Sequence, residues 1–246
     1  MLGALAPPHR TTTTAEAMTD DTTAARPAAR EDLDDLDLGP AAARPDRPAG
    51  FFHSRAWLFG EMLVGAIVSL VASFVLSVDA IELATNPGTV LSCDINAIVS
   101  CGTVGSAPQS ALFGFPNSFL GLVSEPVVIT LAVLGLSRIR FPRWFLVAAQ
   151  SVYLLGVIFA YWLLYQSMFV IGALCPWCLS VTAATTLVFL SMLHWNILEG
   201  TVPWPRRVQS VAMTVVRSGA YGYLTATWFV LLAAAILLKY GSALFA

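Results

Sequence analysis

The sequence predicts an all-α integral membrane protein, namely a four-helix transmembrane bundle with a fifth transmembrane helix. Of its 246 residues, 57% are hydrophobic and only 11% are charged, and the mean hydropathy is +0.73. Crossing the hydrocarbon layer takes roughly 20 apolar residues in a helix, and the chain offers several such runs. They lie near residues 57–78, 117–136, 144–171, 177–195 and 221–238. The segment 1–50 is rich in Thr, Ala, Pro and acids, and we expect it to be a disordered cytoplasmic tail.

The arginines predict the orientation of these helices in a cell (inner or plasma) membrane. Lys and Arg in short loops stay on the cytoplasmic side. Arginines precede the first apolar run and also separate the second from the third and the fourth from the fifth: Arg44, Arg47, Arg55, Arg138, Arg140, Arg143, Arg206, Arg207 and Arg217. We therefore expect a multi-pass protein with a cytoplasmic N-terminus and an extracytoplasmic C-terminus. The loops near 79–116 and 172–176 then face outward, and all four cysteines lie on that side, where disulfides are permitted.

Two of the cysteines stand in the sequence CPWC, residues 175–178, at the start of the fourth apolar run. Pro176 suits the first position of a helix, because its missing N–H has no partner there. Cys175 then caps the helix and Cys178 lies in its first turn, where the helix dipole stabilises thiolates. Thiolate is the attacking species in disulfide exchange. Two alternatives stay open: the four cysteines could bind zinc, or the pair could form a purely structural disulfide.

The other two cysteines, Cys93 and Cys101, lie in SCDINAIVSCGTVGS, residues 92–106, within the long outer loop. A loop pair facing a pair at a helix mouth could form a relay, in which the loop takes electrons from a soluble thiol protein. The alternative is a brace that only stiffens the loop. A relay needs a terminal acceptor, and since no flavin, haem or dinucleotide motif is visible, the simplest acceptor is a membrane-soluble quinone.

Several ordered motifs resemble the bacterial branch of the vitamin K epoxide reductase family. They are CDIN at 93–96, SC at 100–101, Ser106, FGFPNSFLG at 113–121 and CPWC at 175–178. The resemblance covers roughly residues 57–195 and is far more specific than a lone C-x-x-C pair. It implies a transmembrane domain of this type within residues 51–246, whose four-helix bundle holds a quinone near the outer membrane surface.

The resemblance also implies a role for each cysteine. Cys93 would form the mixed disulfide with a reduced partner protein, and Cys101 would then exchange with Cys175. Cys178 would be the sulfur that reacts with the quinone.

Three further residues are implied as contacts in or near the quinone site. Asn117 would hydrogen-bond a quinone carbonyl and stabilise the charge that develops there. Ser106 matches the family's loop serine, which helps to hold the loop against the site. Thr182 stands where some relatives carry an aromatic hydroxyl.

The function predicted from these features is a quinone-dependent thiol oxidase, using menaquinone or ubiquinone, that supports disulfide bond formation. Because the chain stops at Ala246, we expect its partner to be a separate extracytoplasmic thioredoxin-fold (DsbA-like) protein. The alternatives are vitamin K quinone or epoxide reduction, and a non-enzymatic scaffold that is bound to zinc or braced by disulfides. We expect membrane lipid to be a further partner. The few basic residues argue against binding of nucleic acid.

Acidic side chains near the membrane are further candidates. Glu125 falls inside the second apolar run, so it is either a proton-handling group or a side chain paired in the interior. We expect Asp79 and Glu82 to be solvated groups at the interface. Asp94 could raise the pKa of Cys93, or it could merely solvate the loop.

Overall fold

A computed structural model describes residues 50–241 of the chain. Within this range, five helices are long and apolar enough to cross a membrane. They are α2 (Arg55–Thr85), α4 (Ser118–Leu136), α5 (Arg143–Gln166), α6 (Pro176–Glu199) and α8 (Ala220–Tyr240). The predicted fold class is therefore confirmed. The tail expected over residues 1–50 lies outside the described residues, apart from Gly50.

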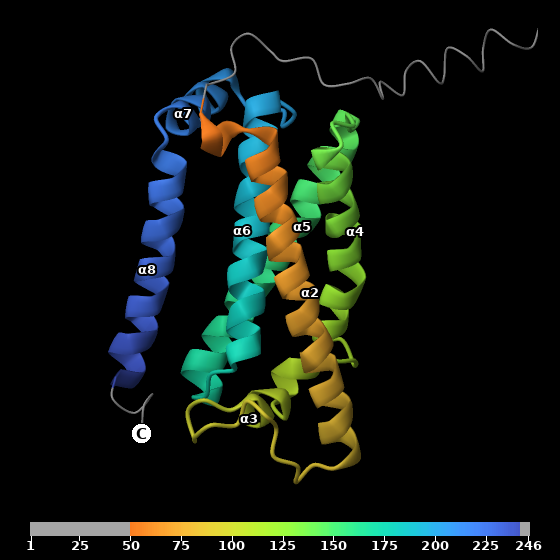
Figure 1. Cartoon of the computed structure of the whole chain (residues 1–246). Coiled ribbons are helices and arrows are strands. Elements are labelled where there is room, and N and C mark those ends of the chain that lie inside the picture. The colour runs from red at the N-terminus through yellow and green to blue at the C-terminus, as the bar shows by residue number, and fades with distance from the viewer. Residues whose placement is uncertain (1–49, 242–246) are drawn as a thin grey trace, which may run out of the picture. The chain divides into compact units, whose positions relative to one another are not determined.

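Shorter elements join the long helices. η1 (Phe51–His53) precedes α2, η3 (Ser167–Ile171) continues α5, and α7 (Arg206–Arg217) links α6 to α8. Between α2 and α4 the chain forms a loop that contains α3 (Cys101–Gly105) and η2 (Pro108–Ala111). Figure 1 shows this loop at one end of the helices, near the start of α6, and α7 at the opposite end. We call these two ends the cysteine end and the α7 end.

Helix α2 lies at the centre of the bundle. It packs along α4 and along α6, and α6 packs in turn against α5, whereas α4 and α5 make few direct contacts. Helix α8 stands beside α6 (Figure 1), and none of its residues is buried. The packing is therefore that of a four-helix bundle with a peripheral fifth helix.

Helix α2 is longer than predicted. The apolar run ends near residue 78, but the helix continues to Thr85. Its 31 residues give a length of roughly 46 Å, against roughly 30 Å for the hydrocarbon layer. Leu83, in the added turns, packs against the buried cluster around the cysteines. The extension therefore carries Asp79 and Glu82 toward the loop that holds Cys93 and Cys101.

Glu125 lies inside α4, and its side chain is only 3% exposed. The Ser69 hydroxyl of α2 donates to Oε1 at 2.8 Å, and the Tyr153 hydroxyl of α5 donates to Oε2 at 2.7 Å. Hydrogen bonds to both oxygens offset much of the cost of taking a carboxyl group out of water. Glu125 is therefore paired in the interior. Its carboxyl group links α4 to α5, two helices that otherwise make few contacts.

Glycine permits the close approach of α2 and α4. A Cβ atom on Gly121 would fall far inside van der Waals contact with Ser73, and one on Gly135 would clash with the ring of Phe59. Neither position accepts a side chain unless the helices shift. Gly121 is the last residue of the FGFPNSFLG motif, so packing explains the glycine there.

We predict that Gly121→Ala lowers the free energy of unfolding by about 1–3 kcal/mol, because the added methyl group pushes α2 and α4 apart. Thermal unfolding in detergent, followed by circular dichroism, measures the loss. The control is Gly60→Ala, since a Cβ at Gly60 would meet nothing within 4 Å. That variant should be as stable as the wild type or up to about 1 kcal/mol more stable, because Ala is the better helix former. An equal loss in both variants would contradict the packing explanation.

Candidate functional site

The CPWC pair lies at the start of α6, as predicted. The helix begins at Pro176, and Cys175 is its N-cap residue. The backbone N–H of Cys178 donates to the sulfur of Cys175, with 3.3 Å between N and Sγ. The Cys178 thiol and the N–H groups of Cys178 and Trp177 lower the pKa of the Cys175 thiol, although burial opposes them. Cys175 is therefore biased toward the thiolate, its nucleophilic form.

The loop pair, Cys93 and Cys101, is joined by a disulfide with the two Cα atoms 5.7 Å apart. Cys175 and Cys178 are free thiols. Zinc binds cysteine as the thiolate, and a sulfur in a disulfide is not a thiolate. In this state the four cysteines therefore do not form the four-ligand zinc site that the sequence left open.

A short backbone bridge docks the loop onto the segment that precedes α6. Val99 and Leu174 form a parallel β-bridge. The N–H of Leu174 donates to the carbonyl of Ile98 at 2.6 Å, and the N–H of Ser100 donates to the carbonyl of Leu174 at 3.0 Å. A cysteine directly follows both Ser100 and Leu174. The bridge therefore brings together one cysteine of each pair.

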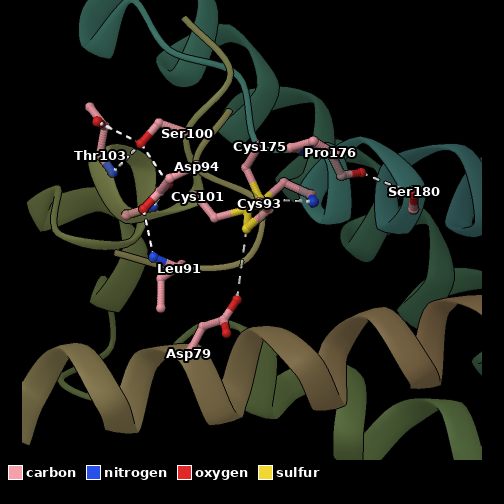
Figure 2. The surroundings of a disulfide bond; sticks show 12 residues. Asp79, Leu91, Cys93, Asp94, Ser100, Cys101, Thr103, Cys175, Pro176 and Ser180 are labelled. Atoms are coloured by element: carbon pink, nitrogen blue, oxygen red, sulfur yellow. Dashed lines mark hydrogen bonds between the residues drawn. A yellow bond between two sulfur atoms is a disulfide. The ribbon is translucent and has the colours of Figure 1, made fainter. Parts of the chain in front are cut away.

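The Sγ atoms of Cys101 and Cys175 lie 3.2 Å apart. Figure 2 shows these sulfurs gathered between the loop and the start of α6. Cys93, Cys101 and Cys175 are 7%, 2% and 1% exposed, and the partly buried Cys178 packs against them. A thiolate in contact with a disulfide sulfur is placed for exchange without a further approach of the two groups.

Asp94 holds the loop in shape. Its carboxylate accepts hydrogen bonds from the N–H groups of Gly102 and Leu91 at 2.8 and 2.9 Å, and from the Ser100 hydroxyl at 2.8 Å. Burial acts to raise the pKa of Asp94, but these donors outweigh it and hold the pKa below its ordinary value. Asp94 therefore braces the loop rather than merely solvating it, and its effect on the pKa of Cys93 stays a prediction.

Asp79 is not the solvated group that the sequence predicted. It is partly buried, and its Oδ2 lies 4.0 Å from the Sγ atom of Cys93. In Figure 2 the Asp79 side chain extends from α2 toward the disulfide. Glu82, one turn further along α2, is exposed as expected and accepts a hydrogen bond from the Thr89 hydroxyl. The prediction failed for Asp79 because α2 runs past its apolar segment and the loop folds back over it.

A model of the vitamin K epoxide reductase family matches residues 61–193. The chain belongs to this family. The match covers more than half of the chain, from α2 to near the end of α6, and does not include α7 or α8. No curated protein matches the sequence at a significant level. Family membership confirms the resemblance found in the motifs, and it makes the chain a membrane oxidoreductase of the disulfide and quinone class.

The resemblance implied three residues as quinone contacts. Their surroundings in the structure differ. Asn117 donates from its amide to the carbonyl of Gln109 at 2.6 Å and accepts from the N–H of Leu112 at 3.2 Å, so it shapes the turn before α4. Thr182 is buried in α6, one turn after the CPWC motif, and donates to a backbone carbonyl of the preceding turn. Ser106 ends α3 with its side chain exposed. Their roles toward a quinone stay predictions.

Aromatic side chains gather near the cysteine end. Phe113 lies against Phe115 and Phe159, with ring centroids 6.0 and 5.6 Å apart, and Phe159 stacks on Trp162 at 5.9 Å. Phe113, Phe115 and Trp162 are all more than a third exposed, beside α4 and α5, which make few direct contacts. A binding site for a quinone needs apolar aromatic surface and a few polar groups for its carbonyls. The rings are of the first kind, and their role toward a quinone stays a prediction.

We predict that Asp94→Asn destabilises the protein by about 1 kcal/mol at neutral pH, because an amide NH₂ in place of one carboxylate oxygen cannot accept a hydrogen bond. The pKa of Asp94 is lower in the folded protein than in the unfolded chain. The contribution of the Asp94 charge to the free energy of unfolding is therefore present above the pKa of the unfolded chain, about 3.9. It is lost as the pH falls through the pKa of the folded protein. Thermal unfolding in detergent from pH 7 to pH 3 should show a wild-type advantage that shrinks below about pH 4. A constant advantage over that whole range would mean that the charge of Asp94 does not brace the loop.

Proposed function

We propose that this protein is a quinone-dependent thiol oxidase that reoxidises an extracytoplasmic thioredoxin-fold partner and thereby supports disulfide bond formation. The observation that carries the proposal is the 3.2 Å distance between Sγ of Cys101 and Sγ of Cys175, which connects the loop pair to the CPWC pair. A mere brace requires only the loop disulfide. The brace alternative does not explain why a free thiol with a lowered pKa, Cys175, lies beside that disulfide.

Electrons enter at the loop disulfide. A thiolate of the reduced partner attacks Sγ of Cys93, the bond between Cys93 and Cys101 breaks, and Cys101 leaves as a thiolate. The second thiol of the partner then displaces Cys93. The partner departs as a disulfide, and the loop holds two thiols.

Electrons then pass to the CPWC pair. The thiolate of Cys101 attacks Cys175 in a disulfide between Cys175 and Cys178, and Cys178 leaves as a thiolate. Cys93 next attacks Cys101 and releases Cys175, which restores the loop disulfide. The described state, with an oxidised loop and a reduced CPWC pair, corresponds to the end of this exchange.

A quinone, when bound, supplies the acceptor for two electrons and two protons. Cys178 and Cys175 give up the two electrons and re-form their disulfide, so the net reaction converts partner dithiol and quinone to partner disulfide and quinol. Asn117 keeps a second amide N–H with which to orient a quinone carbonyl. The rings around Phe113 and Phe159 bind the planar ring and exclude water from it. Menaquinone and ubiquinone are both compatible with this set of residues.

The same proposal places the cysteine end outside the cytoplasm. In the described range, the arginines lie at the start of α2, between α4 and α5, and in α7, which all belong to the α7 end: Arg55, Arg138, Arg140, Arg143, Arg206, Arg207 and Arg217. Basic residues in short loops stay on the cytoplasmic side. The α7 end is therefore cytoplasmic, and the disulfide lies in an oxidising compartment.

We predict that the purified protein in detergent reduces a menaquinone or ubiquinone analogue when it is given a reduced thioredoxin-fold dithiol protein. Cys178→Ser should abolish quinol formation, because it removes the sulfur that delivers electrons. Cys93→Ser should abolish it with the protein dithiol but retain activity with a small dithiol that reduces the CPWC pair directly. Quinol is followed by its absorbance. No quinol with either quinone would refute the oxidase function, and conversion of vitamin K epoxide to its quinone by the same dithiol, without reduction of either quinone, would favour the reductase alternative.

We predict that two single-cysteine variants will label in the pattern that the proposed orientation requires. Val90→Cys introduces a thiol in the exposed loop at the cysteine end, and Ser210→Cys introduces one on the exposed surface of α7. A membrane-impermeant maleimide added to intact cells should label the first variant and not the second. After cell lysis it should label both. The reverse pattern in intact cells would invert the proposed orientation.

A further inference from the structure

Asp79 places a carboxylate against the loop disulfide. Its Oδ2 lies 4.0 Å from Sγ of Cys93, and one carboxylate oxygen lies within 4.8 Å of the sulfurs of both Cys93 and Cys101. Its charge also acts on Cys175 and Cys178. In Figure 2 the side chain points from α2 directly into the space below the disulfide. A single carboxylate therefore lies within electrostatic reach of every sulfur in the relay.

A negative charge in this position opposes the formation of thiolates. Each exchange step needs an attacking thiolate, and a carboxylate beside the attacking sulfur disfavours that form. As a fixed charge alone, Asp79 would slow the relay. The same carboxylate is useful if it takes the proton itself, since a cysteine thiol with a pKa of about 8.5 is mostly protonated at neutral pH.

We propose that Asp79 is the catalytic base for Cys93, an assignment that rests on the thiol oxidase function proposed above. In the step that restores the loop disulfide, Cys93 carries a proton and Cys101 is bonded to Cys175. Asp79 takes the proton as Sγ of Cys93 attacks Sγ of Cys101, the bond between Cys101 and Cys175 breaks, and Cys175 leaves as a thiolate. The electron pair moves from Cys93 to Cys175, and the carboxylate becomes a carboxylic acid. When the partner's second thiol later displaces Cys93, Asp79 returns the proton to its sulfur.

The other charged and titratable groups near Asp79 do not suit this role. The carboxylates that act on Asp79 are Glu82 on its own helix and Asp94 on the loop. Both oxygens of Asp94 accept hydrogen bonds from the loop, which makes Asp94 a weak base. Glu82 is exposed one turn away and bonds to Thr89. Within residues 50–241, the cysteines of the relay also interact with Asp79.

The test follows the disulfides in the fully reduced protein after one equivalent of a quinone is added. Samples are quenched with an alkylating reagent, and the cysteine pairs are mapped by mass spectrometry. In the wild type, the disulfide between Cys101 and Cys175 should exist only briefly. In Asp79→Asn we expect it to persist about 100-fold longer at pH 6, because no base removes the Cys93 proton. The difference should fall by roughly tenfold per pH unit as the pH rises, since the thiolate then forms without a base.

Two further variants make this result specific. Glu82→Gln removes a neighbouring exposed carboxylate and should match the wild type at every pH. Asp79→Glu keeps a carboxylate and should restore most of the rate, which also keeps the test decisive if Asp79→Asn does not fold. The proposal is overturned if Asp79→Asn resolves the mixed disulfide at the wild-type rate across the pH range. It is equally overturned if that variant resolves it faster, because the carboxylate then only repels thiolates.

A parallel series separates this proposal from the function on which it rests. Diamide, a small oxidant of dithiols, replaces the quinone, and the same pairs are mapped. If Asp79→Asn accumulates the pair of Cys101 and Cys175 with diamide while no quinone oxidises the wild type, the catalytic base stands and the quinone-dependent function fails. If quinone oxidises the wild type normally and neither oxidant reveals a dependence on Asp79, the function stands and the base assignment fails.

Discussion

The site depends on two backbone hydrogen bonds between the loop and the segment that precedes α6. They pair Ile98 and Ser100 with Leu174 across a large separation in sequence. Without this bridge the loop disulfide and the CPWC thiols would be two separate features of one membrane protein. With the bridge in place, one sulfur of the loop pair lies in contact with one sulfur of the CPWC pair. Asp94 supports the bridge indirectly, because it fixes the turn from which Ser100 is presented.

The reactive cysteine of α6 is also part of the helix start. An N-cap residue normally uses an oxygen to accept the first free N–H groups of a helix, and here the sulfur of Cys175 does so. The N–H groups that complete the helix are therefore the ones that favour the thiolate. In the proposed relay, the same arrangement would favour Cys175 as a leaving group when Cys101 is released from it. Folding and redox chemistry use one set of contacts at this position.

The sequence was sufficient for those features that follow from local rules. The apolar runs predicted the spans, and Pro176 predicted where α6 begins and therefore where Cys175 and Cys178 lie. It was not sufficient for contacts between distant segments. The bridge at Val99 and Leu174 leaves no mark in composition, since any two residues with free backbone groups could form it.

The acidic residues show the same limit. The apolar run stops beside Asp79, which predicted a solvated side chain, yet the helix continues and brings Asp79 within 4.0 Å of the loop disulfide. Asp94 could not be assigned because its role depends on three donors that converge only when the loop is folded. Glu125 has partners on two other helices, and their spacing along the chain gives no hint of the pairing.

The burial of the loop disulfide has a consequence for selectivity among reductants. Cys93 is 7% exposed and belongs to a buried cluster against which Leu83 and Trp177 pack. Any donor must therefore displace part of the loop before a thiolate can reach the sulfur. A folded protein can offset that displacement with a docking surface, whereas a small thiol brings few contacts to do so. In the proposed function, the loop disulfide would therefore be reduced faster by proteins that can dock on the loop than by low-molecular-weight thiols.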